Sequence, residues 1–174
     1  MALCRPSRPE IAPARSLVIA AGGGRDLAWP HQRVAAELLA RSSGRLVHLL
    51  LHGGARGADA AIGRAARQLG WSARVVPAQW ELHGRAAGPI RNRELLQLAI
   101  AEAIAHTSPM ASTSVLVLAF PGGSGTASLV QQARCMASRS PVPLAVVEVS
   151  PSVGLWVVPS AVAPIVAPRR SPCS

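Results

Sequence analysis

Short apolar runs alternate along the chain with longer segments in which apolar residues recur at helical spacing. The runs have the length and composition of buried strands and cover residues 17–21, 46–51, 73–76, 114–120 and 143–149. The first helical segment begins near residue 30, and the second ends near residue 68. The third runs from about 90 to 104, and the fourth ends near residue 137. Residues 80–89 are expected to form a loop. This alternation predicts an α/β fold, a Rossmann-like three-layer sandwich with a five-stranded, mostly parallel sheet.

The length of 174 residues suits one domain with a substantial core. We expect this domain to cover residues 16–150, between an N-terminal tail (1–15) and a Pro-rich C-terminal extension (151–174) that either adds an edge strand or stays a loose tail. The apolar stretch 153–167 contains Pro159 and Pro164 and is shorter than a membrane span. The apolar run 17–21 near the N-terminus is too short for a signal peptide and ends in glycines. We expect a cytoplasmic protein with no signal peptide and no membrane partner.

The charged residues restrict the chemistry of a ligand site. All eighteen basic residues are arginines, and the formal net charge is +10. Guanidinium groups suit bidentate contacts to phosphate, and a basic surface favours anionic partners in general, nucleic acid among them. Without any lysine, the Walker A motif is excluded. The three cysteines, Cys4, Cys135 and Cys173, form no C-x-x-C pair, so neither a disulfide framework nor a metal site is expected.

Glycine-rich segments follow three of the predicted strands, at residues 22–26, 53–59 and 121–126. The carboxyl ends of parallel strands lie at one edge of the sheet, where α/β proteins bind ligands. Such glycines either make tight turns or let backbone N–H groups approach an anion at a helix N-terminus. Three loops at one edge favour a phosphate site. The predicted ligand-binding residues are Gly23, Gly24, Arg25, Asp26, Gly53, Gly54, Arg56, Gly57, Asp59, Arg91, Asn92, Gly122, Gly123, Ser124, Gly125 and Thr126.

Three residues near these loops, Arg91, Asp59 and Trp80, could each have either of two roles. Arg91 is expected in the first turn of a helix, where a cation opposes the macrodipole and a bound anion would remove the conflict. Alternatively, its side chain points to solvent or pairs locally with Glu94. Asp59 either caps the second helix or accepts a hydrogen bond from a ribose or base. Trp80 either stacks on a base or packs against the protein.

Five ordered segments make the sequence similar to a known family. They are GRD (24–26), GGARGAD (53–59), PAQW (77–80), HGRAAGPIRNR (83–93) and PGGSGT (121–126). Together they resemble the YspA/cpYpsA-related branch of the SLOG superfamily, over about residues 16–149. The resemblance implies a Rossmann-like domain that senses or processes nucleotide-derived ligands, often in prophage or conflict settings. The superfamily also contains the LOG phosphoribohydrolases, the DNA-processing protein DprA and molybdenum-cofactor carriers.

One departure from the family bears on catalysis. LOG enzymes carry P-G-G-x-G-T-x-x-E, whose glutamate is catalytic, and here the matching position is Leu129. Arg91 matches the LOG arginine that precedes the helix. The carboxylates near the predicted site that could replace the glutamate are Asp26, Asp59, Glu81 and Glu94. Catalytic residues are therefore unassigned, with Asp59, Asp26 and Arg91 as candidates.

The sequence favours a domain that binds or senses a nucleotide or nucleotide-derived small molecule through glycine-rich phosphate-binding loops. The first alternative is a LOG-like hydrolase of a nucleotide N-glycosidic bond, which usually needs a carboxylate near the sugar. The second is DprA-like binding of single-stranded nucleic acid, which the net charge motivates. No cofactor other than such a nucleotide is implied, and a homodimer is left open.

Overall fold

The computed structural model of the chain describes residues 14–151. The strands are β1 (Ala14–Gly22), β2 (Leu46–His52), β3 (Ala73–Val75), β4 (Ala111–Ala119) and β5 (Leu144–Glu148). The helices are α1 (His31–Ser42), α2 (Ala58–Gln68), α3 (Trp80–His83), α4 (Ala87–Ala105) and α5 (Ser124–Ala137), with a 3₁₀ turn, η1 (Gly84–Ala86), between α3 and α4. All five expected strands are present within three residues of their expected bounds.

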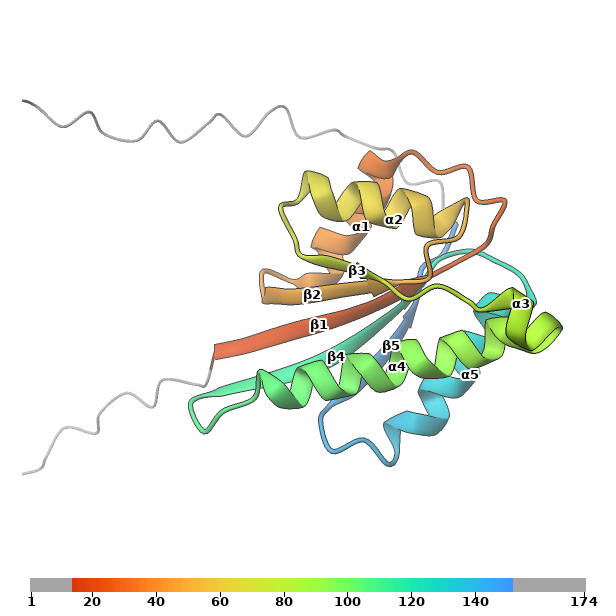
Figure 1. Cartoon of the computed structure of the whole chain (residues 1–174). Coiled ribbons are helices and arrows are strands. Elements are labelled where there is room, and N and C mark those ends of the chain that lie inside the picture. The colour runs from red at the N-terminus through yellow and green to blue at the C-terminus, as the bar shows by residue number, and fades with distance from the viewer. Residues whose placement is uncertain (1–13, 152–174) are drawn as a thin grey trace, which may run out of the picture.

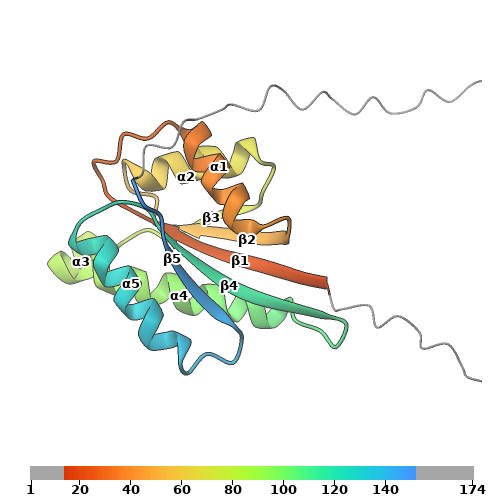
Figure 2. The same cartoon turned by 180° about the vertical axis from the view of Figure 1, so that it is seen from behind.

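The strands form one sheet in the order β3-β2-β1-β4-β5, and each neighbouring pair is parallel. Helices α1 and α2 cover one face of this sheet, and α4 and α5 cover the other (Figure 1). The reverse view shows the same three layers, with β5 at the sheet edge (Figure 2). The expected Rossmann-like three-layer sandwich is confirmed, and its sheet is parallel throughout.

The strand β1 explains why both faces need covering. Leu17, Ile19 and Ala21 are buried in the core beneath α1 and α2. Val18 and Ala20 are equally buried in the core beneath α4 and α5. Because successive side chains of a strand point to opposite faces, an unbroken apolar run is stable only between two helix layers.

The expected loop at residues 80–89 is wrong. This segment contains α3, η1 and the first turn of α4, which begins at Ala87 and not near residue 90. Pro89 is the third residue of α4, where its missing N–H breaks no hydrogen bond because the first four N–H groups of a helix have no partner within it. Arg91 therefore lies in the second turn of α4, so the macrodipole argument for a bound anion at this residue does not hold.

The strand β1 begins at Ala14, so it includes the last two residues of the segment 1–15 that was expected to be a tail. The expected edge strand or tail in the C-terminal extension lies outside the described residues, apart from position 151. None of the helices within residues 14–151 has the length and hydropathy needed to cross a membrane.

Candidate functional site

A cavity of about 550 Å³ opens at the carboxyl ends of the neighbouring strands β1 and β4. From β1 the chain continues to α1 on one face of the sheet, and from β4 it continues to α5 on the other face (Figure 1). The connections therefore diverge between β1 and β4 and leave a crevice, the topological switch point of α/β folds. The lining residues are Ala21, Gly22, Gly23, Gly24, Arg25, Asp26, Ala55, Asp59, Trp80, Arg85, Gly88, Pro89, Arg91, Asn92, Leu95, Gly123, Ser124, Gly125, Thr126, Ser128 and Leu129.

Backbone hydrogen bonds fasten the loops around this cavity to one another. The N–H of Gly24 donates to Pro121 O at 2.9 Å, and the N–H of Ala58 donates to Gly24 O at 3.0 Å. Gly57 has a φ of +72°, and a Cβ at this position would meet the carbonyl of Arg25. Only glycine adopts this conformation and leaves room for the neighbouring loop at no steric cost. This glycine therefore holds the loops together and does not line the cavity.

The N-terminus of α5 faces the cavity without a cap. Gly123 is the N-cap residue, no side chain caps the helix, and the first turn has no acidic residue. A Cβ added to Gly123 or Gly125 would meet no atom within 4 Å beyond the immediate chain neighbours. The first N–H groups of α5 and the positive end of its dipole are thus open to a ligand. This loop has the geometry expected of a phosphate-binding segment.

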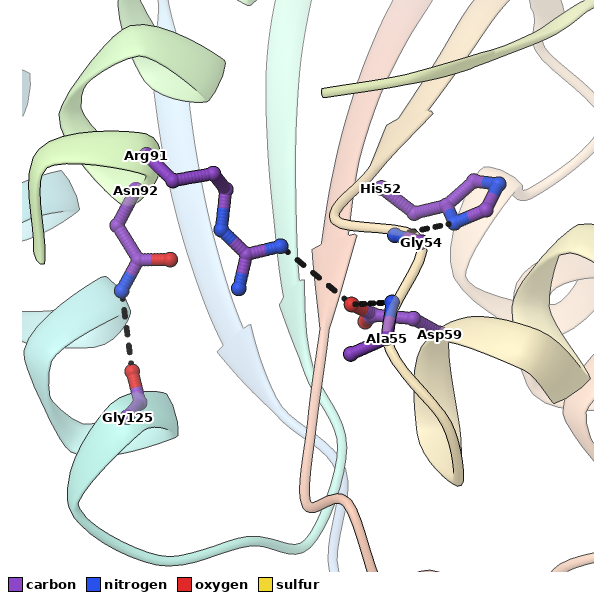
Figure 3. A network of polar contacts seen from close by, with 7 residues as sticks. All are labelled: His52, Gly54, Ala55, Asp59, Arg91, Asn92 and Gly125. Carbon is purple, nitrogen blue, oxygen red and sulfur yellow. Dashed lines mark hydrogen bonds and ion pairs between the residues drawn. The ribbon is translucent and has the colours of Figure 1, made fainter. Parts of the chain in front are cut away.

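Two side-chain hydrogen bonds join α4 to α5, one of them at the N-terminus of α5. Asn92 is buried, and its Nδ2 donates to Gly125 O at 3.1 Å (Figure 3). Gln132 Nε2 donates to Pro89 O at 3.1 Å. Asn92, one of the predicted ligand-binding residues, lines the cavity and uses one of its amide N–H groups for this contact within the protein. Its contact with Gly125 fixes the position of the first turn of α5.

The side chain of Arg91 crosses the cavity from α4 to α2. Its Nη1 lies 3.4 Å from Asp59 Oδ2, and the same oxygen accepts a hydrogen bond from the N–H of Ala55 at 3.2 Å (Figure 3). The guanidinium occupies the space beside Gly53 where a Cβ would lie. Asp59 does not cap α2, because the N-cap is Gly57 and no side chain caps that helix. Both local alternatives for Arg91, solvent exposure and pairing with Glu94, are wrong.

Cations lie at the rim of the cavity. The guanidinium of Arg25 lies 4.8 Å from the ring centroid of Trp80, a cation–π contact between the β1 loop and α3. Trp80 is 47% exposed. Among the described residues no ion pair engages Arg25 or Arg85, whereas Asp26 pairs with Arg56 at 3.3 Å. The lining contains three arginines and two aspartates, and both aspartates are paired, so the free charge at the rim is positive.

His52, at the end of β2, supports the loop behind Asp59. It is buried, and its Nδ1 accepts a hydrogen bond from the N–H of Gly54 at 3.2 Å. Burial lowers the pKa of His52 below its usual 6.5, Arg91 and Arg67 lower it further, and Asp59 opposes them. The hydrogen bond requires an unprotonated Nδ1, so it fits a neutral imidazole.

The structure brings most of the expected site residues to one cavity and leaves five out of its lining. Gly53, Gly54, Arg56, Gly57 and Gly122 do not line it. The second glycine-rich loop contributes only Ala55 and Asp59, because its glycines pack against Arg91, Val75 and the β1 loop. Sequence reasoning assigned no role to Arg85 or Ser128, which do line it. A basic residue among glycines just before a helix was the available signal for Arg85.

Leu129, which the sequence resemblance matches to the LOG glutamate, also lines the cavity. It is 3% exposed, and its Cδ2 lies 3.1 Å from the point that a Cβ on Gly22 would occupy. The floor of the cavity at the end of β1 is therefore apolar on the α5 side. Within residues 14–151, no group of three or more His, Cys, Asp or Glu side chains could hold a metal ion.

These features define a Rossmann-like α/β domain with a basic-rimmed cavity at its switch point. Neither the protein-family models nor the curated proteins contain a match to the chain. Among solved structures, the chain is similar to the DNA processing protein A (DprA) from Streptococcus pneumoniae, with 15% sequence identity and a TM-score of 0.40. The match covers 75% of this chain and 58% of that one, so the chain spans less than two thirds of that protein. At a TM-score below 0.5 the match supports no conclusion about the ligand or the function of this chain.

Proposed function

We propose that this domain binds a nucleotide or a nucleotide-derived small molecule, with its phosphate at the N-terminus of α5. The observation that carries the proposal is the open first turn of α5, where Gly123 and Gly125 leave space next to unpartnered backbone N–H groups. An anion there gains hydrogen bonds and a favourable helix dipole. The hydroxyl of Thr126 is buried without a partner and adds a donor in the same turn.

The size of the cavity and the chemistry of its rim support a ligand larger than phosphate. A volume of about 550 Å³ lies within the roughly 300–1,000 Å³ of small-molecule sites. Arg25 and Arg85 add positive charge at the rim, and the exposed ring of Trp80 offers an apolar surface for a base. A phosphate, a sugar and a base together match this combination of anion site, enclosed floor and aromatic rim.

Calorimetry with nucleoside mono-, di- and triphosphates tests the proposal. Gly123 has a φ of −95°, outside the left-handed region that favours glycine, and a valine side chain there would fill the open space at the helix end. We expect Gly123→Val to weaken binding at least about tenfold, since phosphate contacts to charged or dipolar donors contribute roughly 1.5–3 kcal/mol each. Ala40→Val, on the exposed side of α1 and outside the cavity, is the matched control.

The measurement can contradict the proposal in two ways. Native mass spectrometry and calorimetry that detect no nucleotide binding to the wild-type protein would exclude the function. Equal affinities for wild type and Gly123→Val, with unchanged melting temperatures, would exclude α5 as the phosphate site. A second comparison uses the rim, where Arg85→Ala should weaken binding and Arg64→Ala, an exposed arginine of α2 outside the cavity, should not.

A further inference from the structure

Asp59 lines the cavity, and one of its carboxylate oxygens is buried without a hydrogen-bond partner in the protein. The residue is only 3% exposed. Its Oδ2 is engaged by the N–H of Ala55 and by Arg91, but its Oδ1 is buried and has no hydrogen bond. A buried acceptor without a hydrogen bond raises the free energy of the folded protein by roughly 1–3 kcal/mol, and by more when it is charged. A ligand group that satisfies Oδ1 would therefore gain both its own hydrogen bond and the relief of this deficit.

The chemistry of that ligand group follows from the acceptor. An ionised carboxylate only accepts hydrogen bonds, so the group must be a donor. A phosphate is excluded at this position because it is an acceptor with the same sign of charge. The N-terminus of α5, on the other side of Arg91, is where an anion is favourable (Figure 3). The two ends of the cavity thus demand opposite properties of one ligand, an anion at α5 and a neutral donor at α2.

The surroundings of Oδ1 indicate which neutral donor fits. Asp59 Oδ1 lies 3.8 Å from the point that a Cβ on Gly22 would occupy, and Leu129 Cδ2 lies 3.1 Å from the same point. The acceptor and an apolar side chain therefore meet at the floor of the cavity, at the end of β1. A pentose can contact both, because its hydroxyl groups donate hydrogen bonds to the acceptor and its C–H groups pack against the apolar side chain. A base has its aromatic surface provided at the rim, by the half-exposed Trp80.

We propose that Asp59 binds a ribose hydroxyl, and that the site therefore selects ribonucleotides over deoxyribonucleotides. The inference rests on the proposed nucleotide function and adds the sugar to it. In a nucleoside 5′-phosphate the sugar is the part attached directly to the phosphate. With the phosphate at α5 and the base toward Trp80, the sugar lies over Leu129 and Gly22 and brings a hydroxyl to Oδ1. Arg91 holds the carboxylate in place through Oδ2 and leaves Oδ1 for the ligand.

The test measures Kd by calorimetry for the four ribonucleoside 5′-monophosphates and their 2′-deoxy and 3′-deoxy counterparts. We expect the wild-type protein to bind at least one deoxy series about 10- to 100-fold more weakly than the ribonucleotides, the range for a hydrogen bond to a charged acceptor. Asp59→Asn keeps the shape of the side chain but removes the charge, and it should reduce this discrimination. The matched control is Glu148→Gln, which removes a carboxylate charge outside the cavity, and it should keep the wild-type ratio.

The wild-type comparison alone can overturn the inference, even if Asp59→Asn does not fold. Equal affinities for ribo-, 2′-deoxy and 3′-deoxy nucleotides would exclude a ribose hydroxyl at Asp59 and leave the proposed nucleotide function intact. A wild-type ratio that persists in Asp59→Asn, or that is lost equally in Glu148→Gln, would exclude Asp59 as the discriminating residue. The absence of any nucleotide binding would instead mean that the proposed function itself has failed.

Discussion

The guanidinium of Arg91 fills the space in which a Cβ of residue 53 would lie, so Gly53 and Arg91 fit together only while residue 53 has no side chain. The φ of Gly53 is not positive, so its backbone conformation is open to other residues. The requirement for glycine at this position is therefore one of space and not of backbone conformation. The glycine admits the arginine side chain that reaches Asp59.

Gly53→Ala should lower the free energy of unfolding by about 1–3 kcal/mol, the range for overpacking a buried site. Because the clash is with the Arg91 side chain, the double variant with Arg91→Ala should lose less stability than the sum of the two single changes. Denaturant unfolding of the four proteins measures this coupling. Gly125→Ala is the control, since its added Cβ meets no atom, and it should be neutral or slightly stabilising. Strictly additive effects would contradict the assigned contact.

Removing Arg91 should destabilise the fold far more than removing a surface arginine. Arg91→Ala leaves the carboxylate of Asp59 buried without its counter-charge. We expect a loss of about 2–3 kcal/mol, below the roughly 3–5 kcal/mol of a fully buried pair because the Arg91 side chain is 19% exposed. Arg134→Ala breaks an ion pair with Glu148 in which both side chains are more than half exposed, and it should change stability by less than about 1 kcal/mol. Similar losses for both variants in urea unfolding would refute the structural role of the Asp59–Arg91 pair.

The buried His52 should make the fold less stable in mild acid. Burial lowers its pKa in the folded protein, so below about pH 6.5 the unfolded chain takes up the proton more readily than the folded one. Its contribution to stability is present above the unfolded pKa and is lost as the pH falls through the folded pKa. His52→Asn keeps an acceptor for the N–H of Gly54 but does not titrate, so its stability should depend less on pH.

A second histidine contributes to the same pH range. Burial, and then the charge of the stacked His106, lower the pKa of His48. Some pH dependence should therefore remain in His52→Asn and become smaller in the double variant with His48→Gln. Thermal unfolding between pH 5 and pH 8 measures both. A curve for His52→Asn that parallels the wild-type curve would show that the imidazole of His52 is not coupled to folding.

Because position 129 is a leucine, we expect the protein not to catalyse LOG-type hydrolysis efficiently. Leucine takes up no proton and stabilises no cationic sugar, and loss of such a group commonly lowers a rate by roughly 10² or more. Chromatography of free base after incubation with ribonucleoside 5′-monophosphates should detect no rapid release by wild type. Measurable release on Leu129→Glu would agree with this reading. Rapid wild-type release that is lost in Asp59→Asn or Asp26→Asn would instead show that another carboxylate performs the reaction.

Binding to single-stranded DNA should be weak, non-specific and dependent on salt. The net charge of +10 attracts phosphates at low ionic strength, but such binding depends on counterion release. We expect the affinity for a fluorescent oligothymidine to fall at least about tenfold between 50 and 200 mM salt. Tight binding that persists at physiological salt would favour nucleic acid over a free nucleotide as the partner.

The periodicity of the sequence was sufficient to predict the strands, their parallel arrangement and the edge of the sheet that holds the cavity. These properties depend on local patterns: a buried strand is an apolar run, and glycine-rich loops follow three of these runs. The start of α4 was harder to predict, because glycine and proline at residues 88 and 89 are typical of a loop but are also tolerated in the first turn of a helix. The expected loop at residues 80–89 was wrong for this reason.

Only the tertiary structure decided which glycines face open space and which charges are paired. Gly53 and Gly123 look alike in the sequence, yet one contacts an arginine and the other borders an empty helix end. Arg91 and Asp59 are 32 residues apart, and no local pattern links them. Their contact exists because α2 and α4, on opposite faces of the sheet, both begin at the edge where the parallel strands end. Such pairings depend on the arrangement of whole layers, which periodicity along the chain does not encode residue by residue.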